Sequence, residues 1–114
     1  MFHATIRMLI PPKRRREVLE ILTSLAERFS FETGCISCRI YQDVEVEPMI
    51  MLEQLWMTGE DLERHLRSEE FRKVLLVLEM SRESPEIRFE EISRSTGMET
   101  IEKARNALPG GDRF

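Results

Sequence analysis

Two cysteines in the stretch Gly34-Cys35-Ile36-Ser37-Cys38 form the most conspicuous chemical pattern in the chain. The Cys-x-x-Cys spacing is typical of redox and zinc sites, where the pair sits at a helix N-terminus or beside further ligands. The alternation of the residues here predicts a strand, whose side chains three apart lie on opposite faces unless a bulge intervenes. Since the chain has no other cysteine and only two histidines, the pattern favours packing thiols, with no metal site and no cofactor.

A histidine and a tryptophan are the second group that could do chemistry. His65 lies beside Leu62 and Leu66, at the margin of the apolar stripe of a predicted helix. Its ordinary pKa of about 6.5 suits a general base or a hydrogen-bond partner for a phenolate. Trp56 ends a predicted strand, and its indole can stack on a flat substrate and donate one hydrogen bond. Core packing would explain either residue as well, so catalytic roles for both are hypotheses.

Composition narrows the classes of protein to consider. A chain of 114 residues is long enough for one hydrophobic core. Its formal net charge of -4 gives no positive field for a phosphate backbone, so a nucleic-acid partner is not expected. No apolar stretch reaches the roughly 18 residues of a membrane span, and the N-terminal segment interrupts its apolar pattern with His3 and Arg7, unlike a signal peptide. We therefore expect a cytoplasmic protein with reduced thiols and no membrane partner.

The elements that must position the candidate residues follow one another in a clear order. Residues with a period of two predict strands, and apolar residues at helical spacing predict the segments between them. We expect a strand over 2–10, a helix from Pro12 to before Gly34, strands over 35–42 and 49–56, helical segments opened by Thr58 and Ser68, and a strand over 86–92. This βαββαβ order is that of an α+β, ferredoxin-like fold with a four-stranded antiparallel sheet and its helices on one face.

The strand over 49–56 is apolar on both of its faces. One face carries Ile50, Leu52 and Trp56, and the other carries Met49, Met51 and Leu55. A sheet covered by helices on one side only would expose one of these sets to water. The simplest cover is the same sheet from a second subunit, so the sequence predicts a homodimer formed through the sheet face.

The last residues form a separate unit in the expected organisation. We divide the chain into a domain over 1–93 and a C-terminal extension over 94–114. Thr96 and Glu99 resemble a capping box that opens a short helix. That helix would carry Met98, Ile101, Ala104 and Leu108 on one side and end at Pro109-Gly110-Gly111.

Three stretches together resemble a known family. They are Thr33 to Asp43 (TGCISCRIYQD), Leu52 to Trp56 (LEQLW) and Leu62 to Phe71 (LERHLRSEEF). In order and spacing they are similar to the antibiotic biosynthesis monooxygenase domain family, dimeric α/β-barrel proteins that include quinol monooxygenases. The resemblance covers roughly residues 2–93 and leaves the tail helix outside it.

The resemblance implies a function and a set of site residues. Enzymes of this family oxygenate small phenols or quinols without metal or flavin, while other members have no known reaction. Trp56 and His65 stand at positions that the family commonly fills with the same residues, which implies catalytic roles. Tyr41, Phe71 and Cys38 are implied as substrate-binding residues, although the family usually has an aromatic where Cys38 stands.

Other functions stay open on the sequence alone. A non-catalytic domain that binds a small hydrophobic ligand, or that only dimerises, fits the same pattern. A related branch of the fold degrades haem, but the comparable positions here carry Arg7, His65 and Leu75. Haem ligation is therefore not expected unless His65 serves as the iron ligand. The feature that separates these functions is whether Trp56 and His65 converge on one site.

Overall fold

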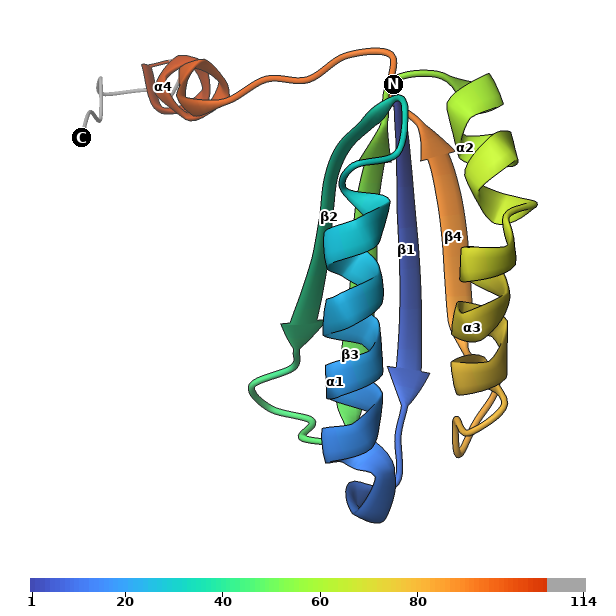
Figure 1. Cartoon of the computed structure of the whole chain (residues 1–114). Helices are drawn as coiled ribbons and strands as arrows, with labels where there is room; N and C mark the ends of the chain where they lie inside the picture. Colours follow the sequence, from blue (N-terminus) through green and yellow to red (C-terminus); the bar gives the residue numbers. More distant parts are fainter. Residues whose placement is uncertain (107–114) are drawn as a thin grey trace.

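The order of helices and strands is that of a ferredoxin-like domain followed by a tail helix (Figure 1). The structure, a computed structural model, describes residues 1–106. Its elements are β1 (Phe2–Leu9), α1 (Pro12–Phe29), β2 (Cys35–Gln42), β3 (Met49–Trp56), α2 (Gly59–Leu66), α3 (Glu69–Leu78), β4 (Glu86–Glu91) and α4 (Met98–Asn106). The strands form one antiparallel sheet in the order β2-β3-β1-β4. The predicted fold class is confirmed, with strand bounds within one residue of those expected.

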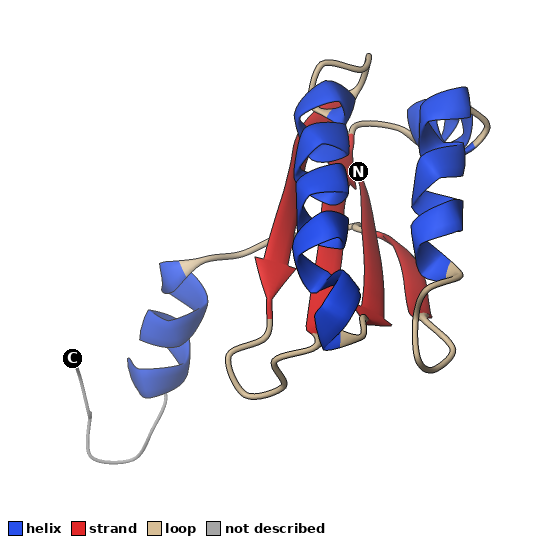
Figure 2. Ribbon diagram, turned by 60° about the horizontal axis from the view of Figure 1, so that its bottom comes forward, coloured by secondary structure: helices blue, strands red, loops and turns tan. Residues whose placement is uncertain are grey.

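The core lies between the sheet and its helices. Helices α1, α2 and α3 lie on one side of the sheet (Figure 2). Alternate residues of β1 point to this side, and the register pairs Ile6 with Leu52 and Met8 with Ile50. The apolar stripe of α1 packs onto them, and the residues of this stripe that are buried are Val18, Leu22, Leu25, Ala26 and Phe29. The N-cap residue of α1, Pro11, makes no side-chain capping hydrogen bond. The helix therefore depends on burial of this stripe for its stability.

Two N-terminal helix caps, Thr58 and Ser68, define the start of α2 and of α3. Thr58 accepts a hydrogen bond from the backbone N–H of Asp61 at 3.1 Å. Ser68 accepts one from the backbone N–H of Phe71 at 3.2 Å. Both caps were predicted from the sequence and are confirmed. They split the helical region into two short helices, and in α2 the buried side chains are those of Leu62 and His65.

The far face of the sheet has no helix over it. We call this surface the open face; it includes His3, Arg7, Met49, Met51, Glu53 and Leu55. His3 pairs with Glu53 at 3.0 Å, and Arg7 lies 3.9 Å from Asp43. The predicted two-sided apolar character of β3 is confirmed, because Ile50, Leu52 and Trp56 are buried while the residues between them are only partly covered.

Helix α4 stands away from the sheet at the end of an extended segment (Figures 1 and 2). None of its residues is buried, and Met98 and Ile101 are more than half exposed. The predicted capping box differs in detail, because Glu99 accepts a hydrogen bond from the backbone N–H of Gly97 at 2.9 Å. Leu108 and the Pro109-Gly110-Gly111 stop lie outside the described residues. Within residues 1–106, no helix combines the length and apolarity that crossing a membrane requires.

Candidate functional site

The two cysteines share one face of β2 because the strand contains a bulge. The register pairs Cys35 with Trp56 and Cys38 with Gln54, with a shift between Cys35 and Ser37. The extra residue undoes the alternation, so the expectation that the cysteines face opposite sides is wrong. Both cysteines are free. Burial raises the pKa of Cys35, and it raises the pKa of Cys38 to about 11. Near neutral pH both thiols are protonated, whereas redox-active cysteines have a depressed pKa.

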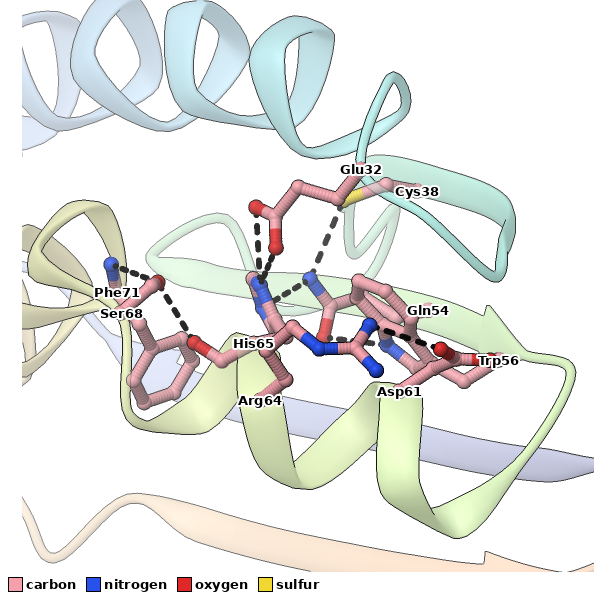
Figure 3. A network of polar contacts seen from close by, with 9 residues as sticks. All are labelled: Glu32, Cys38, Gln54, Trp56, Asp61, Arg64, His65, Ser68 and Phe71. Atoms are coloured by element: carbon pink, nitrogen blue, oxygen red, sulfur yellow. Dashed lines mark hydrogen bonds and ion pairs between the residues drawn. The ribbon is translucent and has the colours of Figure 1, made fainter.

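His65, in the last turn of α2, is the centre of a chain of polar contacts on the side of this helix that faces Glu32 and Gln54 (Figure 3). Its Nδ1 lies 3.1 and 3.2 Å from the two carboxylate oxygens of Glu32. Its Nε2 lies 3.0 Å from the side-chain nitrogen of Gln54. The Gln54 amide oxygen accepts a hydrogen bond from the Trp56 indole at 3.3 Å, and the amide nitrogen also lies 3.5 Å from the Cys38 sulfur. Side chains from the α1–β2 turn, β2, β3 and α2 are thus linked in one network around the imidazole.

The partners of His65 determine where its proton sits. A carboxylate only accepts, so Nδ1 must carry the hydrogen that is donated to Glu32. The other nitrogen is then an acceptor, which matches the amide N–H of Gln54 aimed at it. Burial lowers the pKa of His65 below its ordinary 6.5, and the negative charge of Glu32 offsets part of this shift. The imidazole is therefore neutral near pH 7, with a lone pair at Nε2.

Aromatic rings enclose the imidazole. Trp56 stacks on His65 with ring centroids 4.5 Å apart. Phe29 and Phe71 meet it edge-on, at 4.4 and 5.1 Å. His65 is 1 % exposed and Trp56 is fully buried, while the Glu32 side chain is 30 % exposed. These residues, with Gln54 and Cys38, form what we call the His65 cluster, a dry site in which electrostatic contacts are strong.

A glycine turn brings Glu32 to the histidine. Gly34 has a φ of +83°, a conformation that side chains disfavour. A Cβ built on it would collide with the side chain of Asp61, so only glycine lets the turn approach α2 this closely. The backbone N–H of Met57 donates to the Gly34 carbonyl at 2.8 Å and fastens the turn to the end of β3. The sequence therefore fixes Glu32 over the last turn of α2.

Most of the predicted site residues come together, and one does not. His65, Trp56, Phe71 and Cys38 all belong to the cluster. Tyr41 pairs with Met51 on the open face and is 43 % exposed, so it points away from the imidazole. Tyr41 and Cys38 do meet at a surface hollow of about 480 Å³ between α1 and β2. This hollow is lined by Thr23, Ala26, Glu27, Ser30, Cys38, Arg39, Ile40 and Tyr41.

Two polar members of the cluster were not predicted from the sequence. Gln54 carried a signal, because it is the one polar residue among the alternate positions of β3 that point to the helices. A buried amide needs partners, and those partners are the site. Glu32 carried no signal, since it lies in a turn and meets a residue 33 positions away. Within residues 1–106, no three His, Cys, Asp or Glu side chains are placed to share a metal ion.

Solved structures show the same fold at low sequence identity. A conserved protein of Methanosarcina mazei Go1 is 24 % identical with a TM-score of 0.73, and the match covers 79 % of this chain and 90 % of that one. Rv0793 of Mycobacterium tuberculosis is 15 % identical with a TM-score of 0.75, covering 84 % and 98 %. A proposed antibiotic biosynthesis monooxygenase of Deinococcus radiodurans is 13 % identical with a TM-score of 0.79, covering 85 % and 97 %. At these identities the likeness establishes the fold alone.

A family comparison covers most of the domain. None of the curated proteins compared with the chain matches it. The family profile described as antibiotic biosynthesis monooxygenase matches residues 1–75. That range contains β1 through α2 and most of α3, and with them every member of the His65 cluster. The chain belongs to the antibiotic biosynthesis monooxygenase family.

Proposed function

We propose that the protein is a cofactor-independent monooxygenase that acts on a small phenol or quinol. The observation that carries this proposal is the His65 cluster, in which a neutral imidazole lies between a carboxylate and an amide and against an indole. The chemistry needs a base for a hydroxyl and a dry aromatic wall for a flat ring. Family membership supports the reaction class, and Trp56 and His65 lie in the matched range.

The first step is proton transfer to His65. A phenolic hydroxyl that replaces the Gln54 amide at Nε2 meets a nitrogen with a free electron pair. The O–H bond breaks, an N–H bond forms, and the Glu32 carboxylate stabilises the resulting imidazolium. Trp56 forms the wall on which the ring stacks, and its indole N–H, released from Gln54, donates to the phenolate oxygen.

Dioxygen then reacts with the phenolate. The phenolate gives one electron to dioxygen, and the phenoxyl radical and superoxide combine at a ring carbon as a peroxide. Loss of water from that peroxide leaves a quinone, so a phenol and one dioxygen give a quinone and one water. One oxygen atom enters the product, and the substrate supplies all the electrons. The low-dielectric surroundings of the cluster protect the radical pair from solvent.

We propose in addition that two copies pair through the open face. Met49, Met51 and Leu55 are partly exposed there in a single chain. On β1, Met51 pairs with Arg7 and Leu55 pairs with His3, which suits an interface that also carries complementary ion pairs. The dimer leaves the helix side of each sheet, and with it the His65 cluster, outside the interface.

Oxygen consumption by purified, metal-stripped protein tests the activity. The panel comprises quinols and polyphenols, with heat-denatured protein to correct for autoxidation. Uptake that requires folded protein and no added cofactor is the expected result, and it names the substrate class. His65→Gln is then expected to lower the rate by about a hundredfold. An unchanged rate in that variant would remove His65 from the mechanism.

Ligand binding without catalysis is the second candidate function. Both ring nitrogens of His65 already have partners and the ring is almost fully buried, as expected of a structural histidine. The fluorescence of Trp56, the only tryptophan, reports on binding at the cluster. A fluorescence change with quinols but no oxygen uptake would favour this candidate over the monooxygenase.

A further inference from the structure

We propose that Glu32 is the positioning residue of His65 and the route by which the proton on Nδ1 leaves for solvent. This inference rests on the proposed monooxygenase function, and it assigns a role to a residue outside the aromatic wall and the base. It gives the two ring nitrogens of His65 different roles. Nε2 faces the substrate, and Nδ1 faces a carboxylate that reaches water.

Geometry supports the positioning role. Both Glu32 oxygens lie within hydrogen-bond distance of Nδ1, at 3.1 and 3.2 Å. This shared contact fixes the plane of the ring and the tautomer in which Nε2 is the acceptor. Gly34, two residues after Glu32, packs closely against Asp61 of α2 and so keeps the turn next to that helix. The lone pair at Nε2 is therefore held ready toward the Gln54 side of the cluster.

Exposure supports the proton route. The His65 side chain is 0 % exposed and the Glu32 side chain is 30 % exposed, so the carboxylate spans from the buried ring to water. Aromatic rings cover the other sides of the imidazole. The titratable groups that reach the ring are Glu32 from the α1–β2 turn and, through Gln54, Cys38 from β2. Cys38 is a poor route, because its thiol holds its proton up to high pH.

Within residues 1–106, two arginines on the adjoining helices pair with carboxylates other than Glu32. Arg64 on α2 donates to Asp61 at 2.9 Å, and Arg28 near the end of α1 lies 3.5 Å from Glu70. With these cations engaged elsewhere, the charge of Glu32 acts on the imidazole.

The proton steps balance over one turnover. When the substrate proton reaches Nε2, the Nδ1 proton moves to a Glu32 oxygen and the ring is neutral again. The protonated carboxyl loses that proton to water on its exposed side. Later Nε2 gives its proton to the peroxide oxygen that leaves as water, while Nδ1 regains one from solvent through Glu32. The ring and the carboxylate return to their starting state without any further reactant.

Glu32→Gln tests the proposal, with Glu63→Gln as its matched control. Glu63 lies on α2, is exposed and contacts Arg67 at 3.7 Å rather than His65. The glutamine at 32 keeps an oxygen that accepts from Nδ1, so the fold and the tautomer are expected to survive. It cannot pass on a proton, and its lack of charge further lowers the pKa of His65. We expect kcat to fall by about tenfold to a hundredfold in Glu32→Gln and to stay unchanged in the control.

Nitrogen-15 NMR of the imidazole provides a readout that is independent of turnover. In the unmodified protein Nδ1 should be the protonated nitrogen, and the His65 titration should move to lower pH in Glu32→Gln but not in Glu63→Gln. An unchanged titration, or an unchanged kcat, would overturn the proposal.

Glu32→Asp keeps the charge on a shorter side chain and should recover part of kcat. If Glu32→Gln does not fold, the aspartate variant decides by the same two readouts. If the unmodified protein consumes no oxygen on any substrate, the proposed function and the proton route fail together. The titration alone then decides the positioning role.

Discussion

Two histidine–glutamate pairs in this molecule have almost the same length and opposite surroundings. His65 and Glu32 meet at 3.1 Å beside the last turn of α2, and His3 and Glu53 meet at 3.0 Å on the open face. The buried pair has side-chain exposures of 0 % and 30 %, whereas both residues of the open-face pair are exposed by more than a quarter. Distance alone would rank the pairs as equal. Burial and the further partners of each histidine separate them.

The surroundings decide what each pair can do. Around His65 every polar atom has a protein partner and the rings exclude water, so loss of one member leaves others unsatisfied. Around His3 solvent can replace a lost partner, and salt screens the charges. A pair of the first kind suits proton chemistry. One of the second kind suits a surface that meets another protein.

Histidine-to-alanine substitution should separate the two pairs most strongly. We expect His65→Ala to lower the free energy of unfolding by about 3 to 4 kcal/mol, because it opens a cavity among three rings and strands the amide of Gln54. His3→Ala should cost less than about 1 kcal/mol in the monomer. Urea unfolding followed by circular dichroism measures both variants under identical conditions. Equal losses in the two variants would contradict the distinction drawn from burial.

A charge on the open face should test the proposed dimer. Met51 lies on β3 between Arg7 and Tyr41 in the sheet register. Because Arg7 already lies 3.9 Å from Asp43, Met51→Glu would bury a carboxylate with no cation of its own in a sheet-to-sheet interface, so dimer affinity is expected to fall by at least about a hundredfold. Met57→Glu is the control, since Met57 is 59 % exposed just beyond the end of β3. Sedimentation velocity over a range of concentrations measures the change.

A monomeric mass for the unmodified chain at every concentration would refute the dimer. So would equal dimer affinities for Met51→Glu and Met57→Glu, since the interface would then lie elsewhere. In either case His3 and Glu53 would stay an exposed pair. If the dimer forms as proposed, the open-face pair becomes buried on association, and the difference in burial between the two histidine–glutamate pairs becomes smaller.

The fold could be predicted from the sequence because the patterns that indicate its elements are local. Period-two strands, the apolar stripe of α1 and the caps at Thr58 and Ser68 each lie within a short window of sequence. The bulge between Cys35 and Ser37 could not be predicted from the sequence, because a bulge is set by pairing with β3 and the residues around it still alternate. That one residue changed the conclusion about which face the cysteines share.

Of the His65 cluster, the histidine, two of the aromatic residues and Cys38 were predicted from the sequence, but Glu32 and Gln54 were not. Trp56 and His65 were found because their types restrict what they can do. Their partnership with Glu32 depends on how a turn packs against a helix over 30 residues later, which no periodicity encodes. Tyr41 lies apart from the His65 cluster, because its type suits a substrate pocket but its strand position faces the open side.

The smallest predicted effects concern pH, and the acid side depends on His65. Its pKa is lowered in the folded chain, chiefly by burial. As pH falls below about 6.5, the unfolded chain takes up a proton that the folded chain refuses, so the free energy of unfolding decreases. This contribution is complete above pH 6.5 and is lost on acidification. The carboxyl groups of Asp43 and Asp61, whose pKa is also lowered, act only below about pH 4.

The alkaline side depends on Cys38, whose neighbour in the cluster is the amide of Gln54. Burial raises the pKa of this thiol from 9.0 to about 11 in the folded chain. Its stabilising contribution is therefore present below pH 9 and is lost as pH rises toward 11, by about 1 to 2 kcal/mol once its partial exposure is allowed for. Urea titrations between pH 5 and 11 should show a plateau from roughly 6.5 to 9. Cys38→Ser should reduce the alkaline decline and leave the acid decline in place, because the thiol of the buried cluster accounts for the first and its imidazole for the second.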